Sequence, residues 1–311
     1  MASKSGLPSR PRRPHDAGVD ISVLVSEWDG HRLLDSGDGA KLEEIGGVRM
    51  IRSEPKAWWS RSLPAAEWHR AVAEHEEGGR EGRWKLKGGC PKEWETRLGK
   101  LRFQLRFMDN SKQFGVFAEQ SPHWQWVAAR PQKAEPRPRL LNLFGYTGAA
   151  SLVAAQAGWH VTHVDASKPA VAWGRRNQEL SGLAQEPIRW IIEDATTFVK
   201  REVKRGNRYE AIMLDPPAFG RGPTGEFWKV ERDLAPLLRA CRELLSPQAQ
   251  FILLTVYTID ASSILCRNLL EEITRGLGGQ VDIGELALRQ EHDGRLLPLS
   301  LWGRWTSAGR A

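Results

Sequence analysis

Cysteine is scarce in this sequence, and no long apolar run occurs in it. The three cysteines, Cys90, Cys241 and Cys266, lie far apart among 311 residues. An odd, scattered set argues against a disulfide framework and against a zinc cluster, so we expect no metal and a reducing compartment, the cytoplasm. Because no stretch of about 18 apolar residues is present, we expect no membrane span. Hydrophobic residues at 41% and charged residues at 27% are values typical of a globular protein.

The net positive charge is also small once residues 1–18 are left out. The formal net charge is +7, but residues 1–18 hold four cations and one acidic residue, so the other 293 residues carry an excess of only four. The Pro, Ser and Arg content of residues 1–18 predicts a disordered basic tail without a secretory apolar segment, with an organelle transit peptide as the alternative. A mild positive bias permits a nucleic-acid partner without indicating one by itself.

Residues 19–132 are predicted to form a β-rich N-terminal domain. Short apolar runs alternate with Gly and Asp turn signals in ISVLV (21–25) and in HRLLDSGDGAKLEEIGGVRMIR (31–52). Eight of the fourteen tryptophans lie before residue 130. We interpret them as anchors of a small core, with a base-stacking surface as the alternative. The polar segment KAEPRPR (133–139), with two prolines, marks the linker.

Strands and helices alternate over residues 133–311. Apolar strands are predicted over 139–144, 159–165, 188–194, 209–215 and 250–257, with helices between them. Residues 284–305 predict a β-hairpin around Asp293-Gly294. The βα units in series predict an α/β fold with a doubly wound, mostly parallel sheet. With the hairpin, the sheet has seven predicted strands.

Polar residues stand at the ends of four consecutive predicted strands. These ends are NLFGYTG (142–148), Asp165, Glu193-Asp194 and Asp215-Pro216-Pro217. In a doubly wound sheet, ligands bind at the carboxyl ends of the strands. Gly145 and Gly148 permit close approach of the backbone to a ligand, and Asp165 can accept ribose hydroxyls. Glu193-Asp194, taken alone, is typical of a helix N-cap. Together these ends predict a pocket for an adenosine with a reactive group beside it.

The segments at these ends resemble a known family. LNLFGYTG, HVDASKPAVAWGRRN, IIEDATTFVK and IMLDPPAFG are similar, in order and spacing, to the four motifs of class I S-adenosylmethionine-dependent methyltransferases. The closest likeness is to bacterial RNA methyltransferases of the large-subunit ribosomal RNA methyltransferase I type. It covers about residues 110–257 and includes KQFGVFAEQSPHW (112–124). The resemblance implies a Rossmann-like fold, S-adenosyl-L-methionine as cofactor and ribosomal RNA as partner and substrate.

The resemblance also implies roles for individual residues. Phe144, Gly145, Tyr146, Thr147 and Gly148 would surround the methionine part of the cofactor, with Asn142 beside them, Asp165 on the ribose and Asp194 on the adenine. Asp215 would lie beside the sulfonium, Pro216 and Pro217 would shape the wall, and Phe219 would be available to stack on a target base. Methyl transfer is an in-line displacement at an activated carbon, so the protein mainly positions the reactants. A carboxylate or a proline-flanked carbonyl can orient an amino group by accepting its hydrogen bonds.

A cysteine that some members of this family require is absent here. Members that methylate carbon 5 of cytosine use a cysteine after the fifth strand, because that carbon is a poor nucleophile. This chain has Thr258 in that place. We therefore expect methylation at nitrogen.

The sequence leaves several alternative functions open. They are a methyltransferase with a protein or small-molecule acceptor, a non-catalytic RNA-binding or assembly protein with a relict fold, and a nicotinamide-dependent oxidoreductase. The absence of G-x-G-x-x-G argues against the oxidoreductase, and the three intact aspartates argue against the relict.

Overall fold

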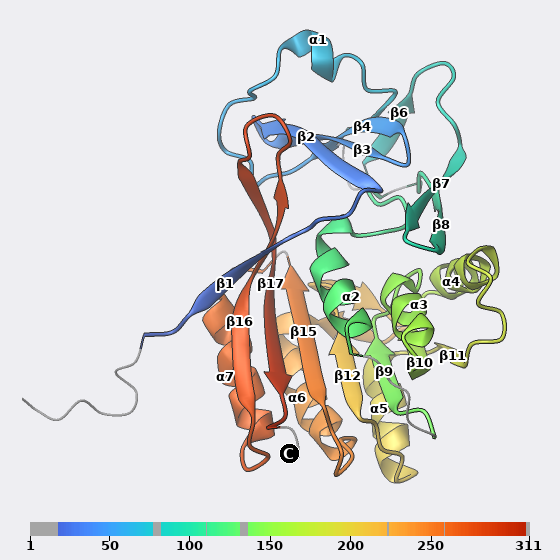
Figure 1. The fold of residues 1–311 in the computed structure, drawn as a ribbon, viewed down its shortest axis with the longest axis vertical. Coiled ribbons are helices and arrows are strands. Elements are labelled where there is room, and N and C mark those ends of the chain that lie inside the picture. Colours follow the sequence, from blue (N-terminus) through green and yellow to red (C-terminus); the bar gives the residue numbers. More distant parts are fainter. Residues whose placement is uncertain are drawn as a thin grey trace, which may run out of the picture.

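The computed structural model describes residues 18–76, 82–109, 111–130, 136–222, 224–257 and 259–308. The predicted basic tail, apart from its last residue Gly18, lies outside these residues, and so does Thr258. A large sheet with helices on both faces forms the lower part of the molecule in Figure 1, and a smaller β-rich unit lies above it. Among the described residues, no helix has both the length and the apolar character that a membrane span requires.

The large sheet has the strand order β1-β16-β17-β15-β12-β9-β10-β11. Five strands run parallel to one another: β9 (Arg139–Leu143), β10 (His160–Asp165), β11 (Ile188–Ile192), β12 (Ala211–Leu214) and β15 (Phe251–Tyr257). β17 (Leu296–Thr306) is antiparallel to both of its neighbours, β15 and β16 (Gln280–Arg289). The central strands are buried on both faces, as helix-covered parallel strands are. The predicted doubly wound, mostly parallel α/β sheet and its closing hairpin are confirmed.

β1 (Ile21–Val25) is an eighth strand, whereas the sequence predicts seven. It pairs in parallel with β16 at the edge of the sheet, so this segment lies with the large sheet and not with the β-rich unit. Gly284 on β16 makes the pairing possible, because a Cβ at this position would lie 1.7 Å from the Ser22 carbonyl oxygen. The local pattern of ISVLV predicts a strand correctly, but it carries no information about which sheet the strand joins.

Helices cover both faces of the large sheet. α5 (Ala195–Lys204), α6 (Val230–Glu243) and α7 (Ser263–Thr274) pack on one face in a core that includes Cys241 and Cys266. The other face is covered by α2 (Ser121–Ala128), α3 (Ala149–Gln156) and α4 (Lys168–Leu180) (Figure 1). The Ser167 hydroxyl caps α4 by accepting a hydrogen bond from the Ala170 amide at 3.3 Å. Both buried cysteines serve packing.

The β-rich unit is built from two sheets. The larger contains β2 (His31–Gly37), β3 (Ala40–Ile45), β4 (Val48–Ser53), β5 (Ala73–Glu76) and β6 (Arg83–Leu86), and α1 (Ala65–Trp68) lies beside it. The smaller contains β7 (Glu93–Leu98) and β8 (Leu101–Arg106), and a 3-10 turn (Ala118–Gln120) leads into α2. Trp28, Trp68 and Trp124 are buried, which confirms the packing interpretation for them, whereas Trp58 is 90% exposed.

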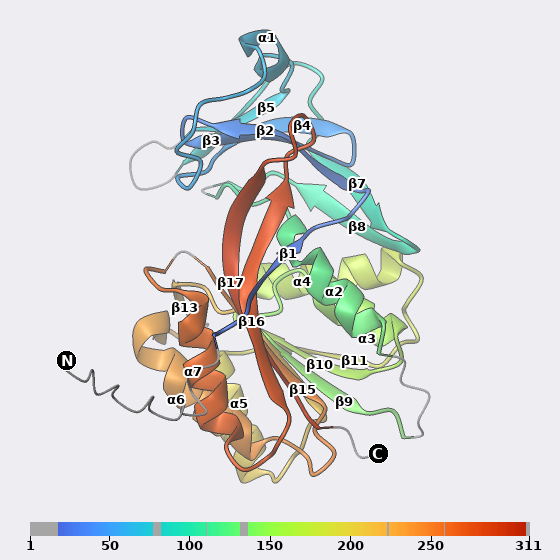
Figure 2. The same ribbon diagram turned by 60° about the vertical axis from the view of Figure 1, so that its left-hand side comes forward.

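The β16–β17 hairpin reaches from the large sheet to the β-rich unit (Figure 2). Near its tip, the Gln290 side-chain amide donates a hydrogen bond of 2.9 Å to the buried Asp35 carboxylate of β2 and accepts one of 2.7 Å from the Ser36 hydroxyl. α2, which precedes the linker, packs against α3, which follows it. We propose that the catalytic unit comprises β1, α2 and the residues after the linker, and that the smaller unit begins at β2.

Candidate functional site

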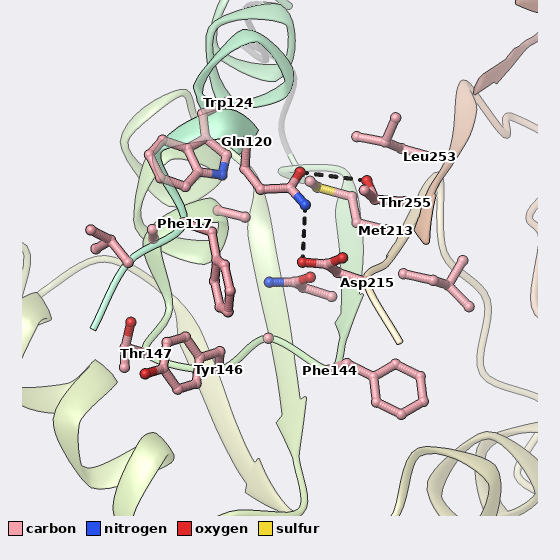
Figure 3. Close-up of a pocket in the computed structure, with 16 residues that line it drawn as sticks. Phe117, Gln120, Trp124, Phe144, Tyr146, Thr147, Met213, Asp215, Leu253 and Thr255 are labelled. Atoms are coloured by element: carbon pink, nitrogen blue, oxygen red, sulfur yellow. Dashed lines mark hydrogen bonds between the residues drawn. The ribbon is translucent and has the colours of Figure 1, made fainter. Parts of the chain in front are cut away.

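Two adjoining cavities lie at the carboxyl ends of the parallel strands, where the sequence predicts the site. The larger has a volume of about 330 Å³, within the range of small-ligand sites, and the smaller about 60 Å³. Phe117, Phe144, Tyr146 and Asp215 line both, so the cavities form one continuous site. Figure 3 shows the residues that line the smaller cavity. Most of the predicted site residues line it: Asn142, Phe144, Gly145, Tyr146, Thr147, Asp165, Asp194, Asp215 and Pro217. Gly148, Pro216 and Phe219 line neither cavity.

The loop between β9 and α3 contains two non-glycine residues with a left-handed backbone conformation, which the sequence does not predict. Phe144 and Tyr146 adopt positive φ values of 57° and 51°, a conformation that side chains with a Cβ rarely adopt. Such residues cluster at functional sites, where surrounding contacts hold them in place. Gly148 also has positive φ, but Gly145 is required for space, because a Cβ there would lie 2.4 Å from the His163 ring.

Buried polar side chains of β9, α3 and β10 form a hydrogen-bonded chain that supports this loop. Asn142 Nδ2 donates to Ser151 Oγ at 2.9 Å, and Ser151 Oγ lies 2.9 Å from His163 Nδ1. Burial lowers the pKa of His163 to about 3, so the ring is neutral and can share this hydrogen bond at physiological pH. Asn142 therefore contributes to the site through the loop that it supports as well as through the cavity that it lines.

Asp165 and Asp194 lie on the cavity wall and accept hydrogen bonds from backbone amides, two at Asp165 and one at Asp194. Asp165 accepts from the amides of Tyr146 and Ser167, both at 2.8 Å, and burial raises the pKa of this carboxyl group. Asp194 Oδ1 accepts from the Thr197 amide at 2.8 Å, so Asp194 is the N-cap of α5, which is the role typical of a Glu-Asp pair taken alone. A carboxylate has about four acceptor positions, so both residues keep capacity for hydroxyl or amino groups of a ligand.

Asp215 lies between the two cavities and is bound at only one of its oxygens. Its Oδ2 accepts a hydrogen bond of 3.1 Å from Gln120 Nε2, and Gln120 Oε1 accepts one of 3.4 Å from the Thr255 hydroxyl (Figure 3). The other oxygen, Oδ1, is buried and has no partner among the described residues. Burial, and then the nearby Glu119 carboxylate, raise the pKa of Asp215 to about 8, so the neutral acid predominates at pH 7.

The prolines after Asp215 lead into a short hairpin of β13 (Phe219–Arg221) and β14 (Phe227–Lys229). The Trp228 indole nitrogen donates to the Pro217 carbonyl at 2.7 Å, and its ring lies 4.9 Å from the Phe144 ring. These contacts join the hairpin to the loop after β9. Phe219, which the resemblance makes available for stacking on a target base, is 73% exposed and lies outside both cavities.

Three residues of the site do not follow from the strand-end argument. Phe117 lies with its ring 5.4 Å from Tyr146 and 6.1 Å from Tyr257, and Gln120 holds Asp215. Phe117 and Gln120 belong to the segment 112–124, so the family resemblance of that segment was the available signal. Tyr257 ends β15, a parallel strand that the sequence predicts over 250–257, so its position was available, but only polar residues and glycines at the ends of the first four strands entered the prediction.

A third cavity, of about 200 Å³, adjoins the site on the side of the β-rich unit and shares Gln113, Phe117 and Tyr257 with it. Its lining includes four cations and two carboxylates: Lys41, Arg52, Lys56, Lys112, Glu54 and Glu119. Positive side chains in a concave surface favour an anionic ligand. Lys41 pairs with Glu54 at 3.2 Å and Arg52 pairs with the buried Glu43, so this side of the site carries only a small excess of positive charge.

The sheet is doubly wound, its strand β17 is antiparallel, and carboxylates lie at the ends of three of its strands. Together these features are typical of a class of enzyme that binds a nucleoside cofactor beside a reacting group. The profile of the S-adenosylmethionine-dependent methyltransferases matches residues 57–284, and the chain belongs to this family. It is an enzyme of the class I, Rossmann-like type that uses S-adenosylmethionine. The oxidoreductase alternative is thereby wrong.

Known proteins agree with this assignment. The chain is similar to a solved S-adenosylmethionine-dependent methyltransferase from Agrobacterium tumefaciens, with 44% identity, a TM-score of 0.87 and coverage of 92% of this chain and 93% of that one. SMU.776, a putative methyltransferase complexed with SAH, shares the fold at 17% identity, with a TM-score of 0.69 and coverage of 89% and 75%. Ribosomal RNA large subunit methyltransferase K/L of Hahella chejuensis is 37% identical over 135 residues, which are 43% of this chain but 18% of that protein.

Proposed function

We propose that this enzyme methylates a nucleobase nitrogen of ribosomal RNA. The observation that carries the proposal is the unpartnered Oδ1 of Asp215, an acceptor in a site flanked by aromatic rings. The names of the K/L relatives from Hahella chejuensis and Methylococcus capsulatus, 37% and 38% identical over the matched parts, support ribosomal RNA as the substrate. The match spans less than a fifth of those relatives, so their substrate enters here as part of the proposal.

In this proposal the larger cavity takes the cofactor. Asp165 would accept hydrogen bonds from the ribose hydroxyls and Asp194 from the adenine amino group, with the capacity that their structural bonds leave. The Phe144–Gly148 loop would surround the methionine part. When bound, S-adenosylmethionine supplies a methyl group already activated on a sulfonium, so the remaining task of the chain is to position the acceptor nitrogen.

Asp215 would perform that positioning. The sulfonium of bound S-adenosylmethionine would place a positive charge beside this carboxyl group. A positive charge there favours the ionised form and so lowers the raised pKa of Asp215. The carboxylate could then accept a hydrogen bond from an amino group of the base, orient the nitrogen lone pair for the transfer, and take up the proton that the nitrogen loses as the methyl group leaves the sulfonium. Phe117 and Tyr257, whose ring centroids lie 6.1 Å apart, would form an aromatic wall against which the base could pack. The Pro217 carbonyl already accepts a hydrogen bond from Trp228, so we assign the role of acceptor to the Asp215 carboxyl group.

The cysteines favour a nitrogen acceptor. Methylation at cytosine carbon 5 needs a thiolate that adds to the ring. Cys241 and Cys266 are buried in the core, where burial raises the pKa of each thiol to about 12, and neither lines the site. Cys90 belongs to the β-rich unit, and burial raises the pKa of its thiol too. No nucleophilic thiolate is therefore supplied by these residues.

Transfer of labelled methyl groups from S-adenosylmethionine to unmodified ribosomal RNA, followed by mass spectrometry of the nucleosides, tests the proposal. We expect label in a base methylated at nitrogen. Label in 5-methylcytidine would overturn the nitrogen acceptor. Label only in protein or in a small molecule would overturn RNA as the substrate. Binding of S-adenosylhomocysteine without any transfer to ribosomal RNA would likewise overturn ribosomal RNA as the substrate.

A further inference from the structure

One face of the β13–β14 hairpin combines two phenyl rings with two cations. In the register of the hairpin, Phe219 lies opposite Lys229, and Arg221 lies opposite Phe227. Side chains alternate between the two faces along a strand, so these four residues share one face. We name this face, formed by Phe219, Arg221, Phe227 and Lys229, the hairpin platform.

The hairpin platform faces solvent. Phe219 is 73% exposed and Phe227 is 53% exposed, and both cations are exposed as well. Lys229 Nζ lies 3.9 Å from the exposed Glu231, a pair that contributes little in water, and Arg221 forms no ion pair with the described residues. Single exposed apolar side chains are common, but two on strands of three residues each, each opposite a cation, form a surface suited to a ligand.

The opposite face of the hairpin fixes this surface next to the methyltransferase site. Trp228 is buried and donates to the Pro217 carbonyl, two residues after Asp215, and its ring packs on Phe144. Arg221 belongs to the hairpin platform and also lines the larger cavity. A ligand that follows the hairpin platform therefore arrives at the mouth of the site.

We propose that the hairpin platform binds single-stranded RNA adjacent to the nucleotide that enters the site. Bases stack on Phe219 and Phe227, and phosphates contact Arg221 and Lys229. Rings interleaved with cations are the combination by which proteins bind unpaired strands, because every base has a π face and every nucleotide a negative charge. An acidic peptide would satisfy the cations but not the rings. This inference rests on the proposed function, since it assigns the RNA strand its path to Asp215.

Binding of a labelled single-stranded RNA of about twelve nucleotides, a length within the usual site size of such surfaces, is measured by fluorescence anisotropy over a range of salt concentrations. Phe219→Ala and Phe227→Ala are each expected to weaken binding about tenfold. Lys229→Gln should lower the slope of log Kd against log salt by about 0.7, the contribution of one contact to a single-stranded phosphate. Phe219→Tyr should bind as the wild type does, because it keeps the ring.

Matched controls lie at the other end of the sheet, before the strands begin. Leu277→Ala removes a side chain that is 37% exposed, and Arg208→Gln removes an exposed cation. Both should bind RNA as the wild type does. The variants Phe219→Ala, Phe227→Ala and Lys229→Gln should keep the wild-type unfolding temperature and affinity for S-adenosylhomocysteine, because these side chains are exposed and line no part of the cavities.

The outcomes separate this inference from the function on which it rests. Wild-type affinity in all three variants, with methylation of ribosomal RNA intact, would overturn the hairpin platform alone. Loss of RNA binding in the variants, with no methyl group transferred to ribosomal RNA by the wild type, would support the platform and overturn the proposed acceptor. A wild-type protein that binds no single-stranded RNA, or that binds anionic lipid vesicles instead, would overturn the hairpin platform.

Discussion

Gln120 donates a hydrogen bond of 3.1 Å to Asp215, a residue 95 positions later in the chain. The Thr255 hydroxyl donates to the amide oxygen of Gln120, which turns the amide nitrogen toward Asp215. One carboxyl oxygen is thus held by Gln120, and Oδ1 is left for the site. The segment before the linker therefore orients the carboxyl group that ends β12.

Replacement of Gln120 should affect the rate of methyl transfer more than cofactor binding. In Gln120→Ala the Asp215 carboxyl group loses its fixed orientation, and we expect kcat to fall by roughly 10- to 100-fold, because displacement reactions depend steeply on alignment. Single-turnover transfer to the RNA measures this effect, and calorimetry with S-adenosylhomocysteine should show near wild-type affinity. The matched control is Gln125→Ala, in which an exposed amide bonded to the Glu27 carbonyl is removed. Equal rates for both variants would contradict the positioning role of Gln120.

The raised pKa of Asp215 predicts a pH-dependent difference in stability. The folded state binds this proton more tightly than the unfolded state does, so ionisation of Asp215 costs stability as the pH rises from about 4 through about 8. Asp215→Asn removes the ionisation. Its unfolding temperature should exceed that of the wild type at pH 9, by roughly 2 °C for each kcal/mol gained, and this difference should be much smaller at pH 5, where only the first part of the ionisation cost has appeared. Asp260→Asn, at an exposed position, is the control. A difference that does not change between pH 5 and pH 9 would show that Asp215 titrates normally.

Asp165 should contribute to cofactor affinity. In Asp165→Ala the ribose hydroxyls lose a charged acceptor, and the Tyr146 amide loses the partner that holds its positive φ. We expect binding of S-adenosylhomocysteine to weaken by about 1–3 kcal/mol, measured by titration calorimetry. Glu179→Ala on the outer surface of α4 should leave this affinity unchanged. Wild-type affinity in Asp165→Ala would remove the residue from the cofactor site.

A variant without cysteine should remain active. Cys90→Ser, Cys241→Ala and Cys266→Ala combined remove every thiol of the chain. We expect methyl transfer to persist, because none of the three residues lines the cavities. The core substitutions should lower the free energy of unfolding by about 1–2 kcal/mol, since each removes a buried sulfur atom. A variant that binds S-adenosylhomocysteine but transfers no methyl group would show that a thiol participates, and the nitrogen acceptor would then be wrong.

The local sequence determined much of the fold and the candidate site. Apolar runs ending in Asp165, Asp194 and Asp215 predicted three parallel strands with carboxylates at one edge of the sheet, because parallel strands bring their carboxyl ends to one edge. The Asp293-Gly294 turn predicted the closing hairpin, and Gly294 adopts the positive φ that such a turn requires. These features depend on periodicity and turn chemistry, which act between residues close in the chain.

Tertiary structure decided the features that depend on residues far apart in the chain. β1 joins the large sheet because Gly284, more than 250 residues later, leaves room for its backbone. Phe144 and Tyr146 carry the positive φ that the sequence analysis would give to glycine, because Asp165 and the support from Asn142 hold their loop. Phe219 faces solvent since the hairpin register places Trp228 inward. The sequence by itself determined which elements form and which carboxylates end them, whereas packing between distant segments decided the orientation of each side chain, because that choice depends on neighbours that only folding brings together.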